Sequence, residues 1–193
     1  MSEVAKKIGI SIDSVVYLMR KNNLKRRSFT ESNKIVFQNK PLSFRVRNNK
    51  SQKSRELEIA GLMLYWAEGY KSVKSVSVDF ANSDPRMILL FLSFLRSTYH
   101  LDKSRFRILL YCYSNQNIDS LINFWSELTN VPKKQFTKPY VRNDFRENGR
   151  VMKYGMIHVR YNDKKLFIDL MQKMGYYIES FMRRSDSGYS SGL

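Results

Sequence analysis

The residue with the clearest chemical potential is Glu68, near the end of a segment that reads ELEIAGLMLYWAEG. Leu57, Gly61 and Leu64 precede it at the i, i+4, i+7, i+11 spacing, so these side chains share one face of a predicted helix. A glycine on that face allows a second helix to approach closely, and Gly69 ends the helix directly after the carboxylate. A carboxylate in this position is solvated, pairs with a cation, or binds a metal ion such as Mg²⁺.

Three predicted strands alternate between an apolar face and a polar face rich in Arg, Lys, Tyr and His. The polar faces consist of Arg105, Arg107, Tyr111 and Tyr113 in residues 105–113, of Lys138, Tyr140 and Arg142 in residues 136–142, and of Tyr154, His158 and Arg160 in residues 153–161. A sheet with helices on its back and these side chains on its front has the chemistry of a DNA saddle. The alternative is the ordinary solvated face of an antiparallel sheet.

Other catalytic chemistry has little support in the sequence. Cys112 is the single cysteine, so zinc and thiol chemistry are not expected. His100 and His158 lack the spacing of metal ligands, and no glycine-rich phosphate loop is present. Asp79 lies on the outward face of a strand predicted over residues 76–80, where it could assist at a metal. A surface aspartate is the commoner explanation of such a residue.

Residues 1–27 have the pattern of a helix-turn-helix. The predicted parts, in order, are a helix over residues 3–8, a turn at Gly9, an N-cap at Ser11 and a helix over residues 12–22. Ala5, Gly9 and Val15 supply the small contact residue, the turn and the buried branched residue that two steeply crossing helices need. Because such a pair usually leans on a third helix, we expect that helix downstream or in a missing preceding segment.

The second of these helices has an outward face suited to DNA. The residues on this face are Asp13, Ser14, Tyr17, Arg20 and Lys21. They are candidates for reaching base edges or phosphates. The alternative is a generic helical hairpin with a solvated basic face, but a basic arm of Lys25, Arg26 and Arg27 follows at once and favours DNA binding.

Composition divides the chain into a basic N-terminal part and a packed C-terminal part. Residues 1–53 contain 13 Lys/Arg and 3 Asp/Glu, whereas the remainder contains 21 and 14. We expect a basic linker or arm over residues 28–53, extended and with a few anchors, an α+β domain over residues 54–178, and a frayed tail over residues 179–193. Further elements predicted in the domain are helices over 85–99, 117–129 and 163–174, the last closed by Gly175, and an edge strand over 136–142, which Pro139 interrupts.

The segment around Glu68 resembles the LAGLIDADG homing-endonuclease family. Residues 61–69 overlay that motif without gaps: Leu64, Ala67 and Gly69 are identical, and Glu68 stands where the family has its metal-binding aspartate. The resemblance implies a domain in which two such helices pack together, from two subunits or two repeats. Their terminal carboxylates would then share divalent metal ions at the scissile phosphates.

Some features depart from the family's pattern. The small pair Ala60-Gly61 lies two residues early, one clear strand follows the motif helix, and an extra helix splits the second strand pair. The resemblance covers residues 60–70 well and residues 55–175 loosely. One motif per chain implies a two-fold homodimer, with Leu57, Gly61 and Leu64 at the helix crossing.

The charge of the chain favours an anionic partner. The 193 residues carry 34 Lys+Arg against 17 Asp+Glu, a net charge of +17, and such a surface attracts phosphate backbones and releases their counterions. A hydrophobic content of 42% argues against a disordered basic tail. Residues 1–8 lack the apolar run of a signal peptide, and the most apolar stretch, residues 87–95, is too short to span a bilayer. We therefore expect a cytoplasmic protein without membrane contact.

Three functional hypotheses follow. The first is a site-specific DNA-binding protein, such as a regulator, that uses a homing-endonuclease-like fold without cutting. The second is an active Mg²⁺-dependent endonuclease, which shares Glu68 with the first. The third is an RNA-binding protein, which would also explain the charge but is disfavoured by the helix-turn-helix pattern. The sequence implies no small-molecule substrate.

Overall fold

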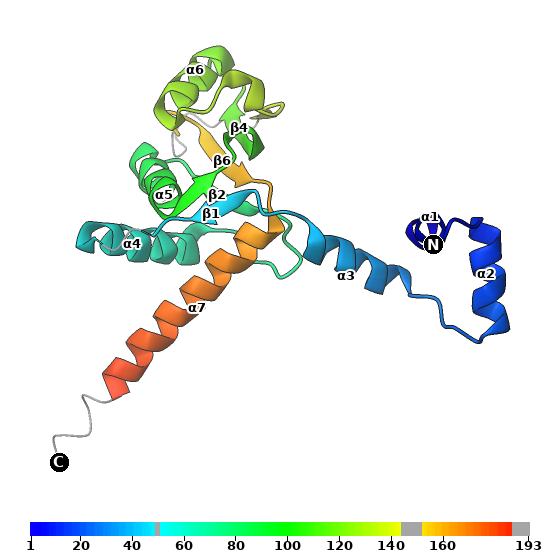
Figure 1. Ribbon diagram of the computed structural model, residues 1–193. Coiled ribbons are helices and arrows are strands. Elements are labelled where there is room, and N and C mark those ends of the chain that lie inside the picture. Colours follow the sequence, from blue (N-terminus) through cyan, green and yellow to red (C-terminus); the bar gives the residue numbers. More distant parts are fainter. Residues whose placement is uncertain (49–50, 144–151, 187–193) are drawn as a thin grey trace. The chain divides into compact units, whose positions relative to one another are not determined.

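The structure, a computed structural model, describes residues 1–48, 51–143 and 152–186. It confirms the predicted α+β class, since helices alternate with strands along much of the chain (Figure 1). The chain divides into two compact units, Met1–Pro41 and Leu42–Leu193. Each unit has buried residues of its own.

The first unit contains the predicted pair of helices. Its helices are α1 (Ser2–Ile8), α2 (Ile12–Lys21) and α3 (Phe29–Asn39). Gly9 ends α1 in the left-handed conformation, with φ at 73°, which glycine adopts without steric cost. Ser11 caps α2 by accepting a hydrogen bond from the backbone N–H of Ser14 at 3.1 Å. Ala5 and Val15 are buried, so the two helices and the turn between them are confirmed.

Residues 28–53 do not form the extended arm that the sequence predicted. Ser28 begins α3 with a capping box, in which its hydroxyl accepts from the Glu31 N–H and its own N–H donates to the Glu31 carboxylate. Strand β1 (Phe44–Val46) belongs to the second unit and pairs antiparallel with β3 (Tyr99–Leu101). The polar composition of these residues shows no apolar periodicity, so the sequence did not predict a helix or a strand there. A local cap stabilises α3, and pairing with the distant strand β3 stabilises β1.

The second unit is built on a sheet with the strand order β2-β6-β4-β5 among the described residues. Its elements are α4 (Gln52–Glu68), β2 (Val78–Asn82), α5 (Pro85–Thr98), the 3₁₀ turn η1 (Lys103–Arg105), β4 (Phe106–Tyr113), α6 (Ile118–Thr129), the 3₁₀ turn η2 (Lys133–Gln135), β5 (Tyr140–Arg142), β6 (Met156–Tyr161) and α7 (Lys164–Asp186). Strand β6 is antiparallel to both β2 and β4, and β5 is parallel to β4. The edge position predicted for residues 136–142 is confirmed.

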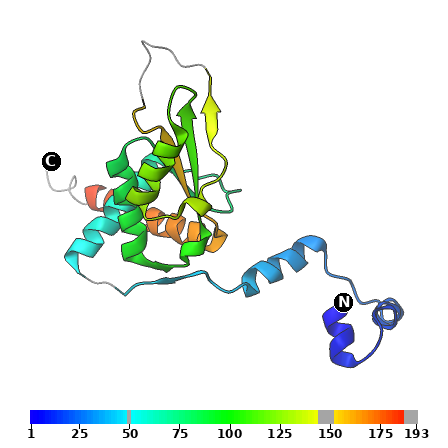
Figure 2. The ribbon, with the colours of Figure 1, turned by 90° about the horizontal axis from the view of Figure 1, so that it is seen from above.

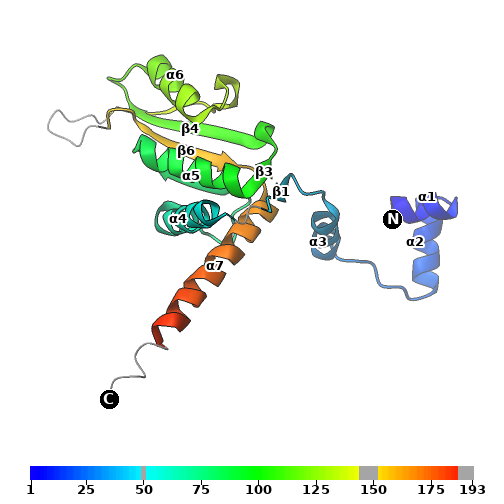
Figure 3. The same cartoon turned by 60° about the vertical axis from the view of Figure 1, so that its left-hand side comes forward.

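Helices cover one face of this sheet. Figure 2 shows α5 and α6 together on the left of strands β4 and β6, and Figure 3 shows α6 nearer to β4 and α5 nearer to β6. Burial alternates along β4, where Ile108, Leu110 and Cys112 are buried among the helices, and along β6, where Ile157 and Val159 are buried. The intervening side chains of both strands therefore lie on the opposite face, as their alternation in the sequence predicted.

Helix α7 does not end at Gly175, where the sequence predicted its close, but continues to Asp186. Tyr177 and Ile178 follow the glycine and pack against the core. This burial outweighs the roughly 1 kcal/mol that a glycine costs within a helix. The first residues of the predicted tail, 179–186, are therefore helical (Figure 1), and its remainder lies outside the described residues.

Helix α4 packs against α5 of the same chain at Gly61. A Cβ atom on Gly61 would overlap the ring and Cβ of Phe94, whose side chain is fully buried. Leu57 and Leu64, on the same face of α4, also pack against the core of their own unit. The predicted role of Gly61 in a helix pair between two subunits is therefore wrong. The glycine was identified correctly as a close-contact position, but its partner is α5.

We expect Gly61→Ala to destabilise the second unit by roughly 1–3 kcal/mol, because the added methyl group overpacks the contact with Phe94. Gly175→Ala is the matched control, since a Cβ at this helical position meets no atom within 4 Å. The control should leave stability unchanged or raise it by about 0.5–1 kcal/mol. Urea unfolding followed by circular dichroism measures both, and equal stability of the two variants would contradict the α4–α5 contact.

Candidate nucleic-acid interface

The sheet face away from α5 and α6 carries most of the predicted polar side chains. We call it the polar sheet face and define it by Asp79, Arg107, Tyr111, Tyr113, Tyr140, Arg142, His158 and Arg160. The strand register places Asp79 opposite Arg160, and Arg160 opposite Arg107, in one row across β2, β6 and β4. Tyr111 of β4 lies opposite Tyr140 of β5. The register thus brings residues from four separate segments onto one surface.

An aromatic row crosses the polar sheet face. The Tyr111 ring lies 5.0 Å from the Tyr140 ring and 5.1 Å from the His158 ring, measured between centroids, with interplanar angles of 43° and 35°. Tyr140 is 56% exposed, so the outer end of this row is open to a partner. Rings in such a row present faces on which nucleic-acid bases can stack.

Asp79 joins two side chains of this face, His158 and Arg160. His158 Nδ1 donates to one carboxylate oxygen at 2.9 Å, and Arg160 Nε donates to the other at 2.7 Å. Burial raises the pKa of Asp79, but the hydrogen bonds from His158 and Arg160 more than offset burial and leave this pKa below its usual value. The sequence predicted that Asp79 assists at a metal or is a surface carboxylate. Neither prediction included its pairing with His158 and Arg160, because the sequence of one strand does not reveal its register with the next strand.

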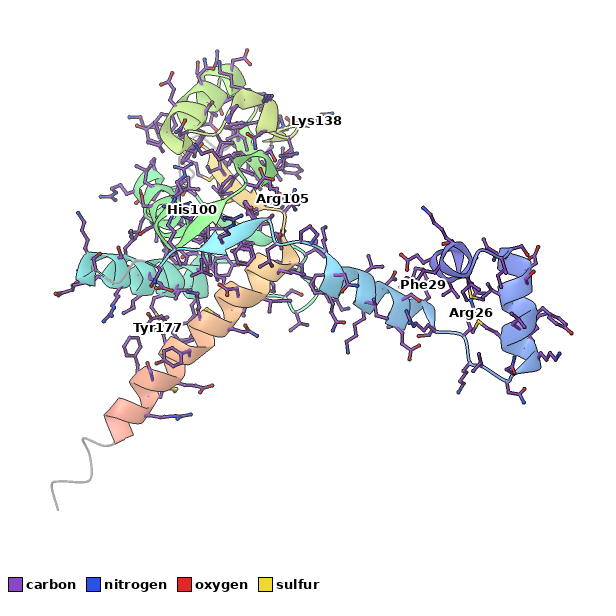
Figure 4. The ribbon with its side chains drawn as sticks, viewed as in Figure 1. Arg26, Phe29, His100, Arg105, Lys138 and Tyr177 are labelled. Carbon is purple, nitrogen blue, oxygen red and sulfur yellow. The ribbon has the colours of Figure 1, made fainter. Side chains whose placement is uncertain are left out.

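The β5 edge supplies two further cations. The Arg142 guanidinium lies 5.8 Å from the centroid of the Tyr113 ring, within the range of a cation–π interaction. Lys138 is exposed in the segment before β5, and Figure 4 shows it pointing away from the ribbon. Arg142 therefore lies in an edge strand as the sequence predicted, whereas Lys138 precedes that strand, because β5 is shorter than the predicted residues 136–142.

Arg105 does not lie on the polar sheet face, although the sequence predicted that it would. It lies in η1, and its Nη1 donates to the carbonyl of Asn162 at 3.0 Å while its Nε lies 3.5 Å from the Asp102 carboxylate. Strand β4 begins one residue later, so Arg105 fastens two chain segments instead of extending the strand face. Arg107 lies on the face, although its guanidinium is held by backbone carbonyls, including that of Ser104 at 2.6 Å.

Tyr154 was also predicted to lie on this face, and the structure places it elsewhere. It lies two residues before β6 begins, and its ring stacks on Phe124 of α6 at 4.2 Å. Its backbone carbonyl accepts a hydrogen bond from the Trp125 indole at 2.7 Å. Tyr154 therefore packs with the helices and does not belong to the polar sheet face.

In the first unit, the outward residues of α2 are exposed as predicted. They are Asp13, Ser14, Tyr17, Arg20 and Lys21. Ser14 also contributes to the cap, since its hydroxyl lies 2.9 Å from that of Ser11. The arm residues Lys25, Arg26 and Arg27 are exposed between α2 and α3, where Figure 4 marks Arg26. The α2 surface and the arm are therefore both accessible in this unit.

Glu68, the candidate metal ligand, is the last residue of α4. Its side chain is exposed at the C-terminal end of α4, beside Gly69, whose backbone bridges to Phe80 of β2. In residues 1–48, 51–143 and 152–186, no three Asp, Glu, His or Cys side chains gather closely enough to hold one ion.

Comparisons with known proteins assign no family to this chain. A scan against protein-family models, a search of curated proteins and a search of solved structures each found no match. Within the described part of the chain, every helix is too short or too polar to cross a membrane. The functional proposal therefore depends on the geometry and charge of the described residues.

We expect Asp79→Asn to lower the free energy of unfolding by roughly 1.5–3 kcal/mol near neutral pH, because hydrogen bonds to a charged partner are weakened. The folded-state pKa of Asp79 is below its ordinary value of 3.8. Its stabilisation is therefore complete above about pH 5 and is lost as the pH falls through the folded pKa.

Urea titrations of both proteins from neutral pH to about pH 3 measure this difference. Glu127→Gln removes an exposed carboxylate from α6 and should change stability by less than about 0.5 kcal/mol at every pH. A difference between Asp79→Asn and the parent protein that stays constant down to about pH 3 would show that the carboxylate charge plays no part.

Proposed function

We propose that this chain is a site-specific DNA-binding protein, in which the polar sheet face and the α2 surface contact the nucleic acid. The observation that carries the proposal is the polar sheet face itself, where three arginines, Arg107, Arg142 and Arg160, accompany a single carboxylate, Asp79. Arginines on one surface suit phosphates, and Asp79 is already neutralised by its two partners. A net charge of +17 supports an anionic partner of this kind.

The first unit supports duplex DNA as the form of that partner. A tight helix pair presents Tyr17 and Arg20 on its second helix, the element that enters the major groove in helix-turn-helix proteins. The Lys25-Arg26-Arg27 arm adds charge suited to the phosphate backbone. Under this proposal, α2 reads base edges, whereas the arm and the polar sheet face contribute affinity that does not depend on sequence.

RNA binding is the second candidate function, and the aromatic row of Tyr140, Tyr111 and His158 is the observation that favours it. Proteins that bind single strands on a sheet stack unpaired bases on such rings. Duplex DNA keeps its bases stacked within the helix and cannot use the row in this way. Relative affinities for duplex DNA, single-stranded DNA and RNA of one sequence therefore separate the two candidates.

We also propose that two copies of the chain form a homodimer, as the resemblance to the LAGLIDADG family implies, but through a different side of α4. Because the Gly61 face of α4 is occupied by α5, a second copy would pack on the opposite side of the helix. That side exposes Ala60, Trp66 and Ala67, of which Ala67 matches the family motif. Cleavage with Mg²⁺ would need carboxylates beyond Glu68, so we place cytoplasmic, non-cutting DNA binding first.

We expect the double variant Lys138→Ala/Arg142→Ala to weaken binding to all duplex sequences alike. The slope of log K against log salt should fall by about 0.9 for each phosphate that the protein no longer touches. The control Arg86→Ala/Arg183→Ala removes the same charge from the exposed surfaces of α5 and α7. Fluorescence anisotropy between about 50 and 200 mM salt measures the slopes. Identical slopes for the two double variants would exclude the β5 edge from the interface.

We expect Tyr17→Ala and Arg20→Ala to relax sequence preference at one or two base positions. Removal of a bidentate hydrogen bond to a base reduces discrimination by roughly 1–3 kcal/mol, whereas the affinity for random DNA should change little. Selection from a randomised duplex library, followed by sequencing, gives the preference of each variant. Exposed Gln38 of α3 provides the control variant Gln38→Ala. Unchanged preferences in both α2 variants would remove α2 from the major groove.

A further inference from the structure

A cavity of about 710 Å³ lies in the second unit, apart from the polar sheet face. Its walls come from the end of α5, from β3, from η1 and from the segment between α6 and η2. Phe106, the first residue of β4, lines it and points to the helix-covered side of the sheet, opposite to Arg107. The cavity therefore opens on a different surface from the proposed DNA-binding face.

Five basic residues line the cavity, and none of its lining residues is acidic. The five are Arg47, Arg96, His100, Lys103 and Lys134. They come from five different parts of the chain, namely the end of β1, α5, β3, η1 and η2. Among the described residues, none of the five forms an ion pair with a carboxylate. The positive charge inside the cavity is thus uncompensated by the surrounding protein.

A basic lining is not a trivial result of the charge of the whole chain. Three other cavities each include an acidic side chain in their lining, namely Glu3, Asp84 and Asp102. Asp102 is next to Lys103 in sequence, but its carboxylate accepts from Ser104 and lines the neighbouring cavity. The absence of a carboxylate therefore distinguishes this cavity from the others.

Two of the cations are held in place by backbone carbonyls. Arg96 Nη2 donates to the carbonyl of Thr129, and Arg47 Nε donates to that of Tyr99 at 3.3 Å. Each guanidinium has further N–H groups, which can bind an anion as a rigid fork. Burial lowers the pKa of Arg96, which means that its charge is partly desolvated without a counter-ion. An anion in the cavity would offset this cost.

The cavity combines this charge with apolar walls. Leu101, Phe106, Val131 and Pro132 contribute to its lining. Gln135 is buried and donates to two carbonyls that belong to η1 and to the start of β4, at 2.9 and 2.8 Å, so the η1 wall is fixed. A volume of this size suits a small organic ligand, and the cations suit phosphate oxygens.

We propose that this cavity binds a phosphorylated small molecule of the nucleotide class. The basic residues hold its phosphates, and the apolar wall contacts its base or sugar. The sequence alone implied no such ligand, because the five basic residues share no spacing along the chain. This site is independent of the proposed DNA-binding function, since its residues are separate from those of the polar sheet face and α2.

Isothermal titration calorimetry of the full chain with ATP and with inorganic pyrophosphate tests the proposal. The variant Lys103→Gln/Lys134→Gln removes two exposed cations of the cavity, and its fold is checked by circular dichroism and thermal melting. The control Lys74→Gln/Lys133→Gln removes two exposed lysines that do not line it. We expect the cavity variant to bind ATP at least about tenfold more weakly and the control less than about twofold.

A nucleic-acid backbone could supply the same phosphate chemistry, so duplex DNA is titrated into the same proteins. The proposal expects duplex affinity to fall equally in the cavity variant and in the control.

The proposal is overturned if neither ATP nor pyrophosphate binds at millimolar concentration, or if the two variants lose ATP affinity equally. A loss of duplex affinity confined to the cavity variant, without ATP binding, would assign the cations to nucleic acid instead. Equal affinities for ATP and pyrophosphate would overturn the nucleotide class.

Discussion

The close crossing of α4 and α5 at Gly61 is the contact on which the second unit depends. Because the Phe94 side chain fills the space of a Cβ atom, the two helices approach more closely than larger residues would allow. Phe94 also lies 6.0 Å from Phe91 and 6.4 Å from Tyr99, between ring centroids. Phe91 in turn stacks on Phe80 of β2 at 4.3 Å. This chain of rings connects the helix pair to the sheet and determines which face of β2 is buried.

That arrangement also places the two faces of the sheet in different environments. Apolar residues of β4 and β6 are buried under the helices, so the alternate residues lie together on the other face. There Asp79 accepts hydrogen bonds from His158 and Arg160. An unpaired carboxylate at this position would oppose an anionic partner, whereas the paired one holds an imidazole and a guanidinium in defined positions. The same contacts thus stabilise the sheet and fix two side chains on its surface.

Excess positive charge is distributed between two chemically different surfaces of this unit. On the polar sheet face the cations accompany exposed rings, which suits an extended polyanion. In the cavity they converge from five elements around an apolar wall, which suits a small ligand. Strand β4 connects the two surfaces, since Phe106 lines the cavity and Arg107 lies on the face.

Much of the local structure was determined by the sequence itself. Alternation in residues 106–113, the Ser11 cap and the turn at Gly9 depend on neighbours within a few residues, and the structure confirms them. The partner of Gly61, the pairing of Asp79, the continuation of α7 past Gly175 and the convergence of cations in the cavity depend on residues distant along the chain. Periodicity identifies a buried face without naming what covers it. At these positions tertiary packing and strand register determined the structure, because the free energy of contacts between distant segments outweighs local conformational preference.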